Sequence, residues 1–138
     1  MRNIKVTFRK DKLTAALQKK FTINCTGDCC LGDVVQFKKA VFGGSYKKPK
    51  FLYNEEITAK IIKDSYGQDK QQHTFTIQIL AVDGRKESRQ TTIKGRNLYR
   101  NGTKRIIWDD ENLRLNVIKE KHERGTRARE DRFKRKNN

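Results

Sequence analysis

The sequence predicts an α+β fold, in the form of a small curved antiparallel sheet or an SH3/OB-like barrel with a short N-terminal helix and a longer basic C-terminal helix. Four or five short runs of strand-like residues are separated by turn signals, which is typical of small antiparallel sheets and barrels. Near the C-terminus the apolar spacing becomes helical and the composition strongly basic. A chain of 138 residues is also the usual length of one domain.

The N-terminal segment is expected to hold a strand and then a short helix. Residues 3–9 alternate in hydropathy with a period of two, which is typical of a half-buried strand. Asp11 can cap the following helix, and Leu13, Ala16 and Leu17 would share one of its faces.

The middle of the chain is expected to supply the main strands. They are predicted from Val34 to Phe42, from Ile57 to Lys63, over residues 73–80 and, more weakly, over residues 91–94. In the strand over residues 73–80, Phe75, Ile77 and Ile79 would face inward. Turns are expected at residues 65–69 and at Asp83-Gly84.

The chain after Trp108 is expected to form a helix. Asp109-Asp110-Glu111 would lie in its first turn, where negative charge suits the helix dipole. Apolar contacts are expected from Leu113, Leu115, Val117 and Ile118. The helix is predicted to reach Arg124 and to stop at Gly125.

The end of the chain is set apart by its composition. Residues 119–138 hold nine Lys and Arg against four Asp and Glu, a net charge of +5. We therefore predict a single α+β domain over residues 1–118 and a basic C-terminal extension over residues 119–138. This extension is expected to be either a second helix or an arm that becomes ordered on a partner.

Positive charge dominates the composition of the whole chain. Lys and Arg number 33 against 16 Asp and Glu, which gives a net charge of +17 and an isoelectric point near 10.1. Such a surplus favours a polyanionic partner, so nucleic acid, DNA or RNA, is the partner we expect. No apolar run approaches the roughly 18 to 20 residues of a membrane span, and no secretory signal is recognised. A role in the membrane is therefore excluded.

The cysteines and histidines do not form a recognised metal site. Cys25, Cys29 and Cys30 are odd in number and closely spaced, which is a poor basis for a disulfide framework. Zinc would need further ligands, and only the lone His73 and His122 could supply them. We expect reduced, partly buried thiols, no metal and no cofactor, and hence a nuclear or cytoplasmic setting.

Catalytic chemistry finds little support in the sequence. The acidic cluster Asp109-Asp110-Glu111 is better explained by helix capping than by Mg²⁺ binding. His73 shares strand parity with Phe75, so it is interpreted as a rim or core histidine rather than a general base. We expect no enzymatic activity. The remaining catalytic alternative is a nuclease or phosphoesterase that combines the acidic cluster with His73 or His122.

Three basic segments carry the candidate nucleic-acid contacts. The loop expected at residues 46–53 mixes lysines with aromatic side chains, as unpaired bases require; the alternative is a solvated turn with Phe51 in the core. Residues 94–105 combine five cations with glycines that allow close approach to a phosphate. Residues 124–136 are interpreted as a phosphate-tracking arm or as a solubilising tail. The candidate residues are Tyr46, Lys47, Lys48, Lys50, Lys94, Arg96, Tyr99, Arg100, Lys104, Arg105, Arg124, Arg127, Arg129 and Arg132.

Several stretches of the sequence also carry a family resemblance. They are Leu31 to Phe37, the string S-Y-G-x-x-K-Q-Q-H-T-F-T within residues 63–76, I-K-G-R-N-L-Y from Ile93 to Tyr99, Trp108, and Glu120 to Gly125. Together they resemble an uncharacterised domain of plant CCCH-type zinc-finger proteins, over roughly residues 31–130. The resemblance implies a nuclear or RNA-linked setting and no particular activity. The chain has no CCCH finger, and a small basic protein of a virus is an equal alternative.

These observations predict a non-enzymatic nucleic-acid-binding protein that uses a basic surface and its C-terminal arm with weak sequence specificity. The alternative is a structural or adaptor module for a protein partner, in a cellular or a viral, genome- or virion-associated setting. In that case the basic face would be docking charge and the aromatic residues interface anchors. Phosphate contacts are alike in DNA and RNA, so the sequence does not choose between them.

Overall fold

The described part of the chain forms a curled antiparallel sheet with three helices. The computed structural model describes residues 6–26, 28–66, 73–99 and 102–136. The strands are β1 (Phe8–Arg9), β2 (Lys12–Leu13), β3 (Ile23–Asn24), β4 (Val34–Gly44), β5 (Pro49–Tyr66), β6 (His73–Val82), β7 (Arg85–Lys94) and β8 (Lys104–Arg105). The helices are α1 (Ala15–Gln18), α2 (Gly95–Leu98) and α3 (Glu111–Lys136). This architecture confirms the predicted α+β class.

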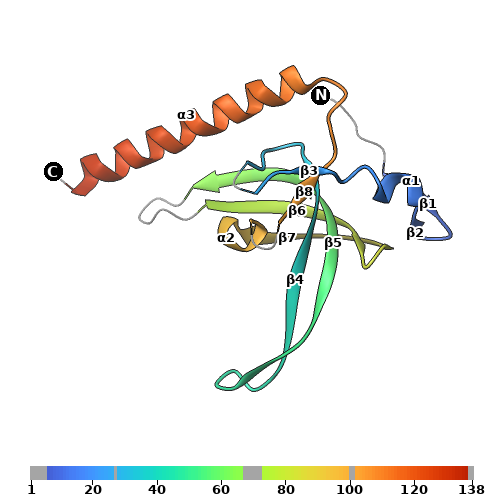
Figure 1. Ribbon diagram of the computed structural model, residues 1–138. Helices are drawn as coiled ribbons and strands as arrows, with labels where there is room; N and C mark the ends of the chain where they lie inside the picture. The colour runs from blue at the N-terminus through green and yellow to red at the C-terminus, as the bar shows by residue number, and fades with distance from the viewer. Residues whose placement is uncertain (1–5, 27, 67–72, 100–101, 137–138) are drawn as a thin grey trace.

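The strands form one sheet in the order β1-β2-β7-β6-β5-β4-β8-β3, and all pairs are antiparallel. Bulges interrupt the pairing of β5 with β6 at Thr58/Ala59 and at Ile61/Lys63, and that of β6 with β7 at Ile79/Ala81. Because bulges bend and twist a strand, they account for the curling of the sheet into a half-barrel. Figure 1 shows α3 crossing one end of this half-barrel and the β4–β5 hairpin projecting from the other end.

Strand alternation places the core on both faces of the sheet. Phe75, Ile77 and Ile79 on β6 are buried in turn, as the sequence predicts. They belong to a cluster on the inner face that includes Val35, whereas the adjacent Val34 belongs to a second cluster. Neighbouring residues of a strand point to opposite faces, so one strand serves both clusters.

The N-terminal strand expected over residues 3–9 is wrong for half of its described part, residues 6–9. Only Phe8 and Arg9 pair, as β1, while residues 6–7 are outside any strand and residues 1–5 lie outside the described part of the chain. Phe8 and Arg9 pair with Leu13 and Lys12, so the chain turns back after two residues. β2 ends at Leu13 because Thr14 caps α1, so the pairing of β1 does not extend back to residues 6–7.

The first helix is also capped differently from the expectation. Asp11 has a φ of 60° in the turn between β1 and β2, so it is not the cap. Thr14 caps α1 instead, because its hydroxyl accepts a hydrogen bond from the Leu17 backbone N–H at 3.3 Å. Leu13 lies in β2 rather than in the helix, and Leu17 alone is buried in α1.

The β4–β5 hairpin is longer than predicted. The sequence predicts one strand that ends at Phe42 and a next strand that begins at Ile57, but pairing runs to Gly44 on β4 and resumes at Pro49 on β5. The same holds for β7, which begins at Arg85 rather than at residue 91. Alternation is a signal of one buried face, and these added residues are mostly exposed, so they leave no such pattern.

The C-terminal helix does not stop at Gly125. It continues to Lys136, and Gly125 is buried without the positive φ of a helix-ending glycine. The boundary expected between residues 118 and 119 lies inside α3, whose Lys121 is also buried. Of the four apolar residues expected to make contacts, Leu113 and Leu115 are exposed, whereas Val117 and Ile118 are half-buried. Within the described ranges, no helix is long and apolar enough to cross a membrane.

Candidate functional site

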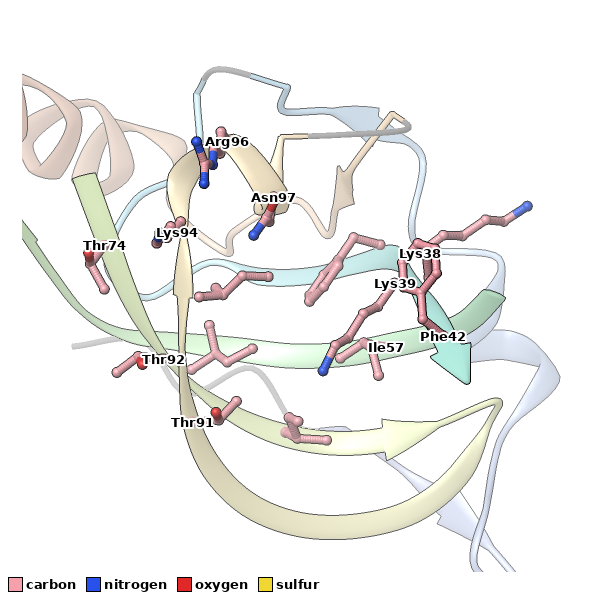
Figure 2. Close-up of a pocket in the computed structure, with 15 residues that line it drawn as sticks. Lys38, Lys39, Phe42, Ile57, Thr74, Thr91, Thr92, Lys94, Arg96 and Asn97 are labelled. Carbon is pink, nitrogen blue, oxygen red and sulfur yellow. The ribbon is translucent and has the colours of Figure 1, made fainter. Parts of the chain in front are cut away.

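The inner face of the half-barrel forms a groove of about 790 Å³. Its floor is apolar and its rim is polar, and the side chains are drawn in Figure 2. The floor is made by Phe37, Ile57, Ile77, Ile79 and Ile93. The polar lining is made by Lys38, Lys39, Thr74, Thr91, Thr92, Lys94, Arg96 and Asn97. Among the described residues that line the groove, none is an aspartate or a glutamate.

One wall of the groove is made by the end of β7 and by α2. Gly95 is buried, and a Cβ added to it would lie 3.2 Å from the His73 carbonyl oxygen. Leu98 is fully buried, so Gly95 and Leu98 together anchor the single turn of α2. Arg96 and Asn97 lie between these anchors and are exposed to the groove. The I-K-G-R-N-L-Y string thus alternates residues that hold the turn with residues that line the groove.

The opposite wall is made by β4. Phe37 is buried in the core, and Lys39 lies two residues further on the same strand, so the two side chains point to the same face. Figure 2 shows Lys39 extending across the groove, whereas Lys38 reaches outward. The partner of Lys39 across the strands is Glu55, but no ion pair joins them among the described residues.

The β4–β5 hairpin carries exposed aromatic residues beyond the sheet. β4 pairs with β8 only at Val35 and Gln36, and β5 pairs with β6 only from Ile57 onward. The outer part of the hairpin, which we call the ribbon (residues 41–53), therefore has two strands only. Its exposed large apolar side chains are Phe42, Tyr46, Phe51, Leu52 and Tyr53. Phe51 is 53% exposed, so the alternative that buried it in the core is wrong.

The turn of the ribbon is built by Gly44 and Ser45. Gly44 has a φ of +80°, and a Cβ at this position would lie 2.7 Å from the Lys48 carbonyl oxygen. The Ser45 carbonyl and hydroxyl oxygens both accept from the Lys48 N–H, at 3.2 and 3.1 Å. This turn leaves Tyr46 fully exposed. Lys47, Lys48 and Lys50 are exposed beside it, so these four sequence-predicted residues are together at the tip.

Other candidate residues lie away from the groove and have partners. Arg105 is buried and binds Glu111 through two hydrogen bonds of 3.0 and 2.7 Å. Arg124 forms ion pairs with Asp64 at 2.7 Å and with Glu120 at 2.6 Å. The structure thus commits Arg105 and Arg124 to holding α3.

The rest of the predicted set is scattered. Tyr99 is half-buried, and its hydroxyl accepts a hydrogen bond from Lys121 Nζ at 3.1 Å. Lys104 is exposed on β8, Arg127 and Arg129 are exposed on α3, Arg132 is half-buried there, and Arg100 lies outside the described residues. The structure brings Lys94 and Arg96 together with Lys39, which the sequence analysis missed. The strand parity of Lys39 with Phe37 was the signal that could have found it.

A buried cation network holds the start of α3. Asp33 is fully buried and accepts hydrogen bonds from Trp108 Nε1 at 2.7 Å and from Arg114 Nε and Nη2 at 2.8 and 2.9 Å. Burial acts to lower the pKa of Arg114, but Asp33 outweighs it and holds this pKa above its usual value. Arg114 is only 4% exposed, so its charge is structural. Sequence spacing gave no signal for this contact between residues 33 and 114.

A second buried cation follows on α3. Lys121 Nζ donates to the Cys29 carbonyl oxygen and lies 5.5 Å from the centre of the Phe75 ring. Burial lowers the pKa of Lys121 below its usual value. For Asp64, burial acts to raise the pKa, but His73 and Arg124 outweigh it and keep the pKa below its usual range. Charged and polar contacts, rather than the leucines expected, therefore dock this helix.

Two members of the acidic cluster considered for catalysis, Asp110 and Glu111, have structural partners, whereas Asp109 and His122 are exposed. The Asp110 side chain accepts from the Asn112 N–H at 2.9 Å, which is a capping contact, and Glu111 binds Arg105. The three cysteines are buried, and burial raises the pKa of Cys30. In the part of the chain that the structure describes, no group of three or more His, Cys, Asp and Glu residues is arranged to hold a metal ion.

Comparisons with known proteins place the groove inside a family. The rice (Oryza sativa subsp. japonica) protein "Zinc finger CCCH domain-containing protein 62" is 44% identical to this chain over 120 residues. The match covers 81% of this chain and 17% of the rice protein, so the chain spans about a sixth of that relative. No solved structure matches the chain.

The family match confirms the resemblance found in the sequence. Residues 30–108 match the family model described as "Domain of unknown function (DUF7699)". The matched segment contains β4 to β8 and α2, and with them both walls of the groove; it ends before α3 begins. The chain is therefore a member of the DUF7699 family.

Proposed function

We propose that this protein is a non-enzymatic nucleic-acid-binding module whose groove holds the sugar–phosphate backbone. The observation that carries the proposal is that Lys39, Lys94 and Arg96 all line one groove that no described carboxylate lines. Phosphates are held by such cations through charge attraction and counterion release. Arginine can also bind a phosphate through two parallel hydrogen bonds.

The other groups of the groove fit the same ligand. Thr74 and Thr91 offer hydroxyl groups and Asn97 offers an amide, which are donors that phosphate and sugar oxygens accept. The isoleucines of the floor suit the apolar faces of sugars and bases. Because few groups here could distinguish base edges, the proposed binding is weakly sequence-specific.

The rice relative supports a setting in which nucleic acid is handled. Its printed name places a CCCH zinc finger in the same protein as this family's domain. A nuclear or cytoplasmic location is proposed on this ground. The relative is a plant protein, so it lends no support to the viral setting that the sequence left open.

A binding titration with charge variants tests the proposal. Fluorescence anisotropy would follow labelled single-stranded and duplex oligonucleotides at several salt concentrations. The variant Lys94→Ala/Arg96→Ala is expected to lower the magnitude of the log–log salt slope by roughly 1.4 for single strands and roughly 1.8 for duplex DNA. The matched control is Lys19→Ala/Lys20→Ala, which removes two exposed cations that do not line the groove. Equal affinity and equal salt slope in the two double variants would show that the groove is not the binding site.

The second candidate is an adaptor module that docks an acidic protein. The exposed apolar side chains of the ribbon favour it, because contiguous exposed apolar patches mark interaction sites. The adaptor function replaces nucleic-acid binding as the proposal if the nuclease-treated protein binds no oligonucleotide at 50 mM salt.

A further inference from the structure

The ribbon has features that a groove for the phosphate backbone leaves unused. Phe42 is 58% and Tyr46 is 100% exposed, whereas Phe37 at the base of the same strand is buried. The Phe42 and Phe51 rings lie opposite each other with centroids 6.1 Å apart and an interplanar angle of 72°. Figure 1 shows this part of the hairpin standing clear of the rest of the protein. These rings therefore do not serve the core.

The backbone of the ribbon is shaped to hold these side chains outward. Gly43 leaves room for Leu52, since a Cβ there would lie 3.0 Å from Leu52 Cδ1. The bulge between Val41 and Phe42 adds one residue on β5 and brings Phe42 opposite Phe51. Together with the turn at Gly44, these features present aromatic rings on a defined two-stranded support.

The charge around the rings is of one sign. From residue 41 to residue 53 the ribbon has three lysines and no aspartate or glutamate. They are Lys47, Lys48 and Lys50. Aromatic faces interleaved with lysines are what proteins use to bind unpaired bases beside their phosphates.

The ribbon is continuous with the groove. Phe42 lines the groove and also belongs to the ribbon, and Lys39, three residues earlier on β4, reaches across the groove (Figure 2). A nucleic-acid strand whose phosphates lie at Lys94 and Arg96 would leave the groove beside Phe42. The next nucleotides would then meet Phe51 and the tip of the ribbon.

We propose that the ligand of this site is single-stranded nucleic acid and that its unpaired bases stack on Phe42, Phe51 and Tyr46. This inference rests on the proposed function, because the groove supplies the phosphate contacts. A duplex keeps its base faces inside the helix, so the rings would find none there. A ribbon that enters a major groove reads base edges best with arginine, asparagine or glutamine, none of which occurs in residues 41–53, and the largest exposed side chains of this ribbon are aromatic.

The test compares single strands with duplexes of the same sequence, using the full chain. We expect single-stranded RNA or DNA to bind at least about tenfold more tightly than the duplex at equal salt. Tyr46 is the fully exposed tip residue, so Tyr46→Ala should not unfold the protein and weaker binding would report the loss of the ring. Tyr46→Ala and Phe51→Ala are each expected to weaken single-strand binding roughly 5- to 150-fold, with the salt slope unchanged, because no cation is removed. Tyr46→Phe keeps the ring and should restore binding.

The matched control is Phe133→Ala, which removes an aromatic residue that is 68% exposed on α3, at the other end of the molecule from the ribbon (Figure 1). It should leave binding unchanged. The inference is overturned if Tyr46→Ala and Phe51→Ala bind single strands as the wild type does, or if duplex binds as tightly. If Lys94→Ala/Arg96→Ala still weakens binding in that case, the groove stands without the stacking ribbon. If neither set has an effect, the proposed function fails as well.

Discussion

Two groups of cations in this protein have the same chemistry and opposite surroundings. The docking cations hold α3 against the sheet and are Arg105, Arg114, Lys121 and Arg124. Each is wholly or partly buried and hydrogen-bonded to a carboxylate or a carbonyl oxygen. The groove cations are Lys39, Lys94 and Arg96, which are exposed around an apolar floor with no carboxylate in the lining.

The difference shows why a charge count does not locate a binding surface. A buried cation must be paired, since an uncompensated charge in the interior is strongly destabilising. The surplus of +17 is therefore not uniformly available to a partner. The groove cations differ from the docking cations in the groups that surround them. These surroundings cannot be read from a run of basic residues in the sequence.

The largest expected effect is on stability, from a substitution that removes the partner of a docking cation. Asp33→Ala would leave Arg114 buried without its carboxylate, so we expect the free energy of unfolding to fall by about 3–5 kcal/mol. Urea denaturation followed by circular dichroism measures this loss. Asp28→Ala is the control, because the exposed Asp28 side chain lies 3.5 Å from Arg114 and its loss should cost less than about 1 kcal/mol. A near-wild-type midpoint for Asp33→Ala would contradict the structural role of this pair.

A smaller effect is expected where Trp108 packs beside Asp33. Gly32 has a φ of +95°, and a Cβ there would lie 2.9 Å from Trp108 Cη2. Gly32→Ala should therefore lower the free energy of unfolding by about 1–3 kcal/mol through strain, with a further loss from the displaced ring. Gly102→Ala has a positive φ but no atom within 4 Å of the added Cβ, so it should cost only about 1 kcal/mol. Equal losses in the two variants would argue against close packing of Trp108.

A smaller effect again is expected from removing one groove cation. Lys39→Gln should weaken oligonucleotide binding and lower the magnitude of the salt slope by roughly 0.7 to 0.9, with little change in stability. Lys104→Gln removes an exposed cation that does not line the groove, and it should bind as the wild type does. Anisotropy titrations at several salt concentrations measure both. A larger loss for Lys104→Gln than for Lys39→Gln would move the interface away from the groove.

The smallest effect concerns the pH dependence of α3 docking. The pKa of Asp64 is below its usual value in the folded state because His73 and Arg124 outweigh the effect of burial. The stability it contributes is therefore present above the unfolded pKa of about 4 and is lost as the pH falls through the folded value. Melting temperatures measured from pH 6 downward should drop more steeply for the wild type than for Asp64→Asn. Parallel curves would show that this carboxyl is not coupled to folding.

Sequence patterns predicted the parts of the fold in which one face is buried. Alternation identified β6 and its inward residues Phe75, Ile77 and Ile79. Alternation did not identify the outer half of the β4–β5 hairpin, where the exposed residues leave no pattern. The end of α3 was wrongly predicted at Gly125. Local rules treat a glycine as an end signal, whereas here it is buried in the middle of a helix.

The candidate site was predicted in part for a similar reason. Lys94 and Arg96 were found because they lie in a dense basic segment. The strand parity of Lys39 with Phe37 predicts the face on which Lys39 lies, but its place opposite α2 depends on the curling of the sheet. Arg105 and Arg124 belong to equally basic segments, but Glu111 and Asp64 neutralise them. Pairing of this kind depends on tertiary contacts and has no local signature.

The most direct test of the account is the salt dependence of single-strand binding for two triple variants. One changes the groove cations Lys39, Lys94 and Arg96 to glutamine, and the other changes Lys12, Lys19 and Lys20, which are exposed outside the groove. Both remove three positive charges. We expect the groove variant to lose roughly 2 from the magnitude of the log–log slope while the control keeps nearly the wild-type slope. Equal slopes for the two variants would contradict it, because net charge rather than the groove would then determine binding.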